Sequence, residues 1–192
     1  MVPFSSYCNI ARSFARYWNA YGGWCSFFQS PYVHTSAVLA FLLYRFSPNI
    51  DVLTKEVFKL TISITPSILG FTLAGLTVFL GVGDEKFRNA IRGKRQNSKT
   101  ESPFLSVIAT FVHFCVIHGL SLLNAIIGGT LFKTCLPFFY KITSIWLFVY
   151  SLLLIFASIM AVFFLAVLYD KAKQPEDDSQ AKQFRVTVKK ID

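Results

Sequence analysis

The sequence predicts an all-α integral membrane protein with four transmembrane helices. Four long apolar segments occupy most of the 192 residues, and the charged residues are concentrated between these segments and at the chain ends. A helix needs about 20 mainly apolar residues to cross a hydrocarbon core of roughly 30 Å. Continuous apolar runs without alternation favour helices over barrel strands. The expected spans are 24–46, 60–82, 104–126 and 142–169.

These spans divide the chain into an N-terminal segment (1–23), a transmembrane domain (24–169) and a C-terminal tail (170–192). The first span is the least apolar of the four, because it contains Gln29, Pro31 and His34. The last span is 28 residues long. A helix of that length is about 42 Å long, so we expect it to tilt or to project past the headgroups.

The basic residues predict the orientation. Fourteen of the 19 lysine and arginine residues lie in the N-terminal segment, in the loop after the second span and in the tail. The positive-inside rule then places both termini and this central loop in the cytoplasm. We attribute the net charge of +9 to contact with anionic lipid headgroups, so we expect no direct binding of nucleic acid.

The N-terminal segment carries aromatic and apolar residues at spacings of three and four. This pattern predicts a short amphipathic helix in the inner interface of the membrane, with its aromatic face toward lipid. A helix packed against a partner protein is the alternative. The expected membrane-interface residues are Tyr7, Phe14, Tyr17 and Trp18.

Two exposed regions are candidates for partner binding. The central loop is basic and either docks an acidic cytoplasmic protein or serves only to fix the topology. Its candidate residues are Lys86, Arg88, Arg92, Lys94 and Arg95.

The tail is expected to consist of a linker over 171–182 followed by a short strand. Phe184, Val186 and Val188 share one face of an extended strand in this interpretation. Because a lone strand is unstable, it would pair with another copy or with a partner protein. A disordered tail is the alternative.

Small and polar residues mark two features inside the spans. Ser63, Ser67, Gly70 and Ala74 form a seam along the second span, and such seams let helices approach closely. We expect this seam to support packing and a homo-oligomer. In the third span, His118 and Asn124 either form a polar path or make buried contacts between helices.

No feature of the sequence indicates an enzyme, a cofactor or a metal site. His113 and His118 are five residues apart and do not share a helical face, so they are a poor metal pair. The core of each span lacks acidic and basic residues, which also disfavours a coupled transporter. A phosphate-binding glycine loop, a nucleophile elbow and an HExxH motif are all absent from the sequence.

Residues 66–91 carry a resemblance to a known family. Pro66 is followed by Leu-Gly-Phe at 69–71, by further small residues and by Gly-Asp-Glu-Lys-Phe at 83–87. Together with four spans and the chain length, this stretch resembles the KwaA-like membrane subunit of the Kiwa bacterial anti-phage defence system. The resemblance implies a homo-oligomer in the bacterial inner membrane that senses phage attachment or membrane disturbance. It also implies a cytoplasmic DNA-binding effector, KwaB, as the partner.

Three hypotheses of function follow. The first is a non-enzymatic inner-membrane sensor and scaffold that oligomerises and recruits a cytoplasmic effector in antiviral defence. The second is an oligomeric pore that depolarises the membrane, suggested by the small-residue seam and the polar face at His118 and Asn124. The third is a small efflux transporter, which the missing intramembrane carboxylate disfavours.

Overall fold

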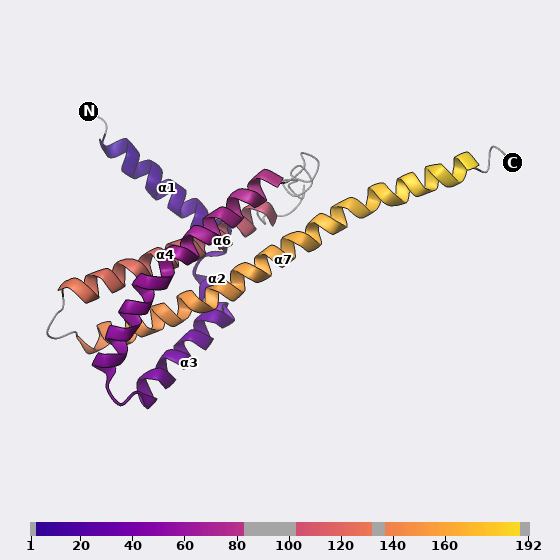
Figure 1. Cartoon of the computed structure of the whole chain (residues 1–192). Coiled ribbons are helices and arrows are strands. Elements are labelled where there is room, and N and C mark those ends of the chain that lie inside the picture. Colours follow the sequence, from indigo (N-terminus) through magenta and orange to yellow (C-terminus); the bar gives the residue numbers. More distant parts are fainter. Residues whose placement is uncertain (1–2, 83–102, 132–136, 189–192) are drawn as a thin grey trace.

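The computed structural model describes residues 3–82, 103–131 and 137–188. Over these ranges the backbone is helical and contains no strand, so the prediction of an all-α protein is confirmed. Figure 1 shows a bundle from which α1 and the C-terminal half of α7 project in different directions. The helices are α1 (Pro3–Tyr21), α2 (Gly23–Gln29), α3 (Pro31–Phe46), α4 (Ile50–Val82), α6 (Pro103–Leu131) and α7 (Phe138–Val188).

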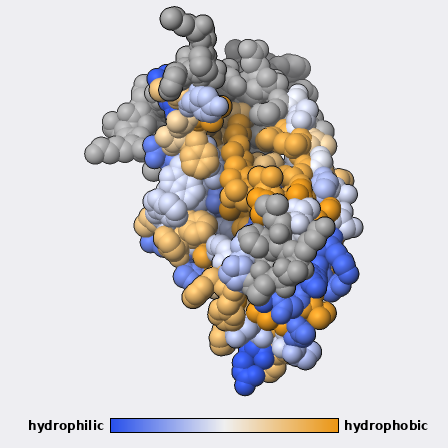
Figure 2. Space-filling model, turned by 90° about the vertical axis from the view of Figure 1, so that its left-hand side faces the viewer, coloured by the Kyte–Doolittle hydropathy of each residue, from blue (hydrophilic) through white to orange (hydrophobic). Residues whose placement is uncertain are grey.

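Three of these helices are long and apolar enough to cross a membrane. The qualifying segments are Ile50–Thr77, Phe104–Thr130 and Phe138–Phe164, which overlap three of the expected spans. Large apolar side chains lie exposed on them, including Phe71 (86%) and Phe139 (81%). Figure 2 shows hydrophobic side chains across the middle of one face and hydrophilic ones at its lower end. Exposed apolar surface of this extent indicates a membrane protein.

A continuous first span over 24–46 is not confirmed, because that segment is divided between α2 and α3. Ser30 is extended, with φ −67° and ψ 125°, and Pro31 occupies the first turn of α3. Proline lacks an N–H, and the first turn of a helix is the position where this loss costs least. The 16 residues of α3 extend over about 24 Å, which is less than the thickness of a hydrocarbon core.

The bundle is built from two helix pairs, with α3 packed on α7 and α4 packed on α6, while α6 and α7 also contact each other.

The buried face of α4 includes threonines whose hydroxyls bond to its own backbone. Thr54 donates to the Ile50 carbonyl and Thr61 to the Val57 carbonyl, each at 2.7 Å. These bonds allow polar side chains to lie in an apolar interior. Two buried clusters fill the bundle: Ala40, Val57, Ile145 and Val149, and Val33, Phe114, Tyr150 and Leu154.

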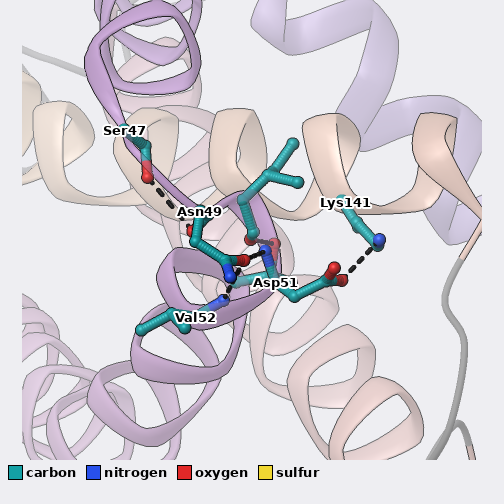
Figure 3. A network of polar contacts seen from close by, with 7 residues as sticks. Ser47, Asn49, Asp51, Val52 and Lys141 are labelled. Carbon is teal, nitrogen blue, oxygen red and sulfur yellow. Dashed lines mark hydrogen bonds and ion pairs between the residues drawn. The ribbon is translucent and has the colours of Figure 1, made fainter.

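Helix α4 begins at Ile50, ten residues before the expected start of its span. The Asn49 side chain accepts hydrogen bonds from the N–H groups of Asp51 (2.9 Å) and Val52 (3.3 Å). It thereby satisfies two of the N–H groups that a helix start leaves free. Lys141 of α7 forms an ion pair with Asp51, so this end of α4 is also tied to α7 (Figure 3).

Replacing Asn49 by alanine should lower the free energy of unfolding by about 1 kcal/mol, because the cap of α4 is lost. Thermal unfolding in detergent measures the change. Asn9→Ala, on the exposed surface of α1, is the matched control and should leave the unfolding temperature unchanged. Equal stability of the two variants would show that the Asn49 cap contributes nothing.

The expected tail structure is wrong, because α7 continues as a helix of 51 residues to Val188. Neither the extended strand at Phe184, Val186 and Val188 nor the linker over 171–182 is present. Residues two apart in a helix lie about 200° apart around the axis, so these three do not share one face. A helix that is already formed extends by one hydrogen bond per residue, whereas a strand needs a neighbouring strand.

Candidate functional site

Two glycines turn the chain sharply between α1 and α2. Gly22 and Gly23 have positive φ angles of 102° and 66°, a conformation that residues with a side chain rarely adopt. A Cβ atom at Gly22 would also collide with the Ser26 side chain. The turn leaves the C-terminal half of α1 in contact with α6, while the N-terminal half projects from the bundle (Figure 1).

His113 of α6 lies at the centre of this contact and is hydrogen-bonded on both ring nitrogens. Its Nδ1 is 2.7 Å from the Tyr17 hydroxyl of α1, and its Nε2 is 3.0 Å from the Tyr150 hydroxyl of α7. A neutral imidazole has one donor and one acceptor, so one hydroxyl donates and the other accepts. This chain of hydrogen bonds joins three helices through one side chain.

Aromatic rings enclose the imidazole. Tyr21 stacks on His113 with ring centroids 4.0 Å apart and an interplanar angle of 13°. Trp18 and Phe27 lie on other sides of the ring, with centroids 6.4 and 6.2 Å away. His113 is only 2% exposed. Burial, with a smaller effect from Tyr21, raises the pKa of Tyr17 to about 12, so its hydroxyl remains protonated at neutral pH.

The expected interface residues divide into two groups. Tyr7 (73% exposed) and Phe14 (54%) remain accessible on the projecting half of α1. Tyr17 and Trp18 are half-buried and contact His113 inside the chain. The aromatic face of α1 therefore contacts the bundle at its C-terminal end, and an interfacial position of its N-terminal half stays a prediction.

A cavity of about 460 Å³ lies beside His113, between the α1–α3 segment and the helices α6 and α7. Hydroxyl-bearing residues contribute to its lining from the α1–α3 segment and from α6, while α7 contributes mostly apolar side chains together with Ser158. Among the residues that the structure describes, the lining contains no lysine, arginine, aspartate or glutamate. Representative members are Tyr21, Ser26, Ser30 and Ser106 for the polar part and Leu154, Ala157 and Phe164 for the apolar part.

The expected polar path consists of two separate environments. His118 is fully buried; its Nδ1 bonds to the Phe114 carbonyl at 3.0 Å, and its Nε2 has no partner among the described residues. The side-chain amide of Asn124 donates to the Ser144 hydroxyl at 2.9 Å, and the Tyr140 hydroxyl donates to the backbone carbonyl of Asn124 at 2.8 Å. Asn124 therefore lies in a contact between α6 and α7, and a continuous path to His118 stays a prediction.

The predicted packing seam faces away from the rest of the chain. Ser63, Ser67, Gly70 and Ala74 are all exposed on α4, and a Cβ atom at Gly70 would meet nothing within 4 Å. The seam is therefore not used within one chain, and contact with a second copy stays a prediction. The basic loop residues Lys86, Arg88, Arg92, Lys94 and Arg95 lie outside the described residues.

The sequence interpretation missed the bonds that His113 makes to two tyrosines. Tyr17 and Tyr21, four residues apart on one helical face, together with a histidine inside a span, were the available signal. Metal binding receives no support in the described ranges, where no three His, Cys, Asp or Glu side chains are close enough together to hold a metal ion.

No known protein family, curated protein or solved structure matches this chain. The site is therefore interpreted from its own geometry.

Proposed function

We propose that the protein is a non-enzymatic membrane sensor and scaffold, in which α7 connects an intramembrane cavity to a cytoplasmic partner. The supporting observation is the continuity of α7. Leu154 and Phe164 line the cavity beside His113, and the same helix continues to Val188 beyond the bundle. A shift or rotation of α7 at the cavity would therefore move its projecting end.

The proposed topology has both termini in the cytoplasm, as the distribution of basic residues indicates. In this arrangement α2 and α3 together complete the first crossing, although neither spans the membrane alone. Two hydrogen bonds pair backbone groups at their junction: the Ser30 N–H donates to the Phe27 carbonyl at 3.2 Å, and His34 Nε2 bonds to the Phe28 carbonyl at 2.7 Å. Broken helices with such compensation occur in membrane proteins beside cavities.

The partner and the biological role follow from the resemblance to the Kiwa membrane subunit. It supports a homo-oligomer in the bacterial inner membrane that recruits a KwaB-like effector against phage. The exposed seam on α4, formed by Ser63, Ser67, Gly70 and Ala74, is a surface on which copies of the chain could pack closely.

Deleting residues 171–192 should abolish binding of the cytoplasmic partner and leave membrane insertion intact. Affinity capture of the tagged protein from its own host, with the partner identified by mass spectrometry, measures the effect. A flexible glycine-serine segment of the same length in place of 171–192 is the control for chain length, and it should also fail to bind. Unchanged partner binding by the deletion variant would remove α7 from the proposal.

An oligomeric pore is the second candidate, and one observation favours it. His118 Nε2 is a buried polar atom without a partner among the described residues, inside a helix able to span a membrane. Ionisable groups inside a membrane usually face the bundle interior or a water-filled cavity, and the second case would suit a pore. Single-channel recording of the pure oligomer in planar bilayers tests this function, and a silent oligomer counts against it.

A further inference from the structure

The cavity beside His113 has a lining of hydroxyl-bearing and apolar side chains, and the part from α7 is mostly apolar. Ser26, Ser30 and Ser106 belong to its lining, where Ser26 and Ser106 are exposed and Ser30 is half-buried. Ala157 and Phe164 of α7 belong to the apolar part of the lining. Its volume of about 460 Å³ lies in the range of sites that hold small ligands, which is about 300–1,000 Å³.

We propose that this cavity binds an uncharged amphiphile from the lipid phase. The ligand class has one small head group with a hydroxyl or carbonyl, which the serine hydroxyls bind, and an apolar tail, which lies along α6 and α7. The same chemistry is present in diacylglycerol-type lipids and in quinones, so these are the two sources to distinguish.

The absence of charged side chains from the described part of the lining favours an uncharged ligand. A charged head group would lose its hydration in the cavity without gaining an opposite charge from the described lining, which contains no Lys, Arg, Asp or Glu side chain. His113 adds no charge partner in its place, since both of its ring nitrogens already bond to Tyr17 and Tyr150. Neutral hydroxyl or carbonyl groups, in contrast, exchange hydrogen bonds with serine at little cost.

The position of the cavity selects a ligand from the membrane. Its α6 and α7 lining residues, from Ser106 to Phe114 and from Leu154 to Phe164, fall inside two segments able to span a bilayer. Met160 and Phe164 lie in the lining and are also exposed on the outer surface of α7. A ligand could therefore enter from the hydrocarbon phase without crossing an aqueous surface.

This inference names the stimulus for the proposed sensor and so rests on that function for its biological meaning, but binding is measured separately. The variant without residues 171–192 should bind the ligand as the intact chain does. Absence of ligand binding by both the intact chain and this variant would overturn the cavity proposal. Retained partner binding by the deletion variant would overturn only the role of α7.

The test uses the full-length protein in lipid nanodiscs and a photoactivatable diacylglycerol. Labelling should map to peptides of α6 and α7 that line the cavity, and unlabelled diacylglycerol should compete. Stronger competition by decylubiquinone identifies the carbonyl source and keeps the proposed chemistry. Equal competition by phosphatidic acid with the same acyl chains would overturn the selection for an uncharged head group.

Two variants connect the labelling to the cavity. Ala157→Trp fills the apolar part of the cavity and should reduce labelling at least tenfold, whereas Ala37→Trp on the exposed face of α3 should leave it unchanged. Removing two hydroxyls, with Ser26→Ala and Ser106→Ala together, should weaken competition about tenfold while keeping the shape of the site. Labelling at the level of the unchanged protein in both the Ala157→Trp variant and the double-serine variant would overturn the proposal.

Discussion

Replacing Gly128 by valine is expected to lower the free energy of unfolding by about 2–3 kcal/mol. A Cβ atom at Gly128 would lie 2.6 Å from Cε2 of Phe58 and 3.0 Å from a ring carbon of Tyr140. Phe58 is buried on α4, so its ring cannot move aside without disturbing the contact between α4 and α6. The effect of the clash exceeds the gain in helix propensity from replacing glycine, which is at most about 1 kcal/mol.

Gly129 provides a matched control on the same helix. A Cβ atom there meets nothing within 4 Å, so Gly129→Val should change the free energy of unfolding by less than about 0.5 kcal/mol. Thermal or denaturant unfolding in the same detergent compares the two variants. Equal stability of the two would contradict the packing of α4 against α6 at this level of the bundle.

The two buried histidines of α6 should respond differently to leucine substitution. His113→Leu removes the hydrogen-bond partner of the Tyr17 hydroxyl and one of the partners of Tyr150, which should lower stability by about 1–3 kcal/mol. His118→Leu removes a buried nitrogen that has no hydrogen-bond partner in the described structure, so it should be neutral or stabilising. Both substitutions exchange side chains of similar size.

Two measurements separate these effects. Thermal unfolding in detergent reports stability, and limited trypsin digestion at Arg16, beside Tyr17, reports whether the C-terminal half of α1 stays on the bundle. His113→Leu should accelerate cleavage there, because α1 loses the bond that holds Tyr17, while His118→Leu should not. Unfolding and cleavage that are the same in both variants would contradict the role of His113 as the anchor of α1.

The apolar pattern of the sequence was sufficient to find three long helices, because length and composition decide whether a helix can span a membrane. It placed the start of α4 too late because the charged residues Lys55, Glu56 and Lys59 end the apolar run. The helix nevertheless continues through them, with Glu56 and Lys59 paired at 2.6 Å one turn apart. The Asn49 cap was the available signal for the true start.

The break at Ser30–Pro31 and the helical tail were harder to predict. Hydropathy averages over a window, so it does not register that Pro31 removes one N–H and ends the continuity of the first span. At the tail, a short alternating pattern predicted a strand from residues 184–188 alone. That pattern carries no information on whether the preceding helix stops, and α7 continues through it.

The contact between His113 and α1 joins residues that are far apart in the sequence, so it was hard to predict. Tyr17 and His113 are separated by 96 positions, and their pairing requires both the glycine turn after α1 and the packing of α6 against α7. Spacing within one segment does not contain this information. It did show that His113 and His118 lie on different faces, and the structure places them in different environments.

Native mass spectrometry of the tagged, full-length protein, gently extracted from its own host, is the most direct test of the sensor and scaffold proposal. The proposal predicts a homo-oligomer that carries a cytoplasmic protein in fixed stoichiometry. A homo-oligomer without such a partner, combined with conductance in planar bilayers, would contradict it and would favour the pore.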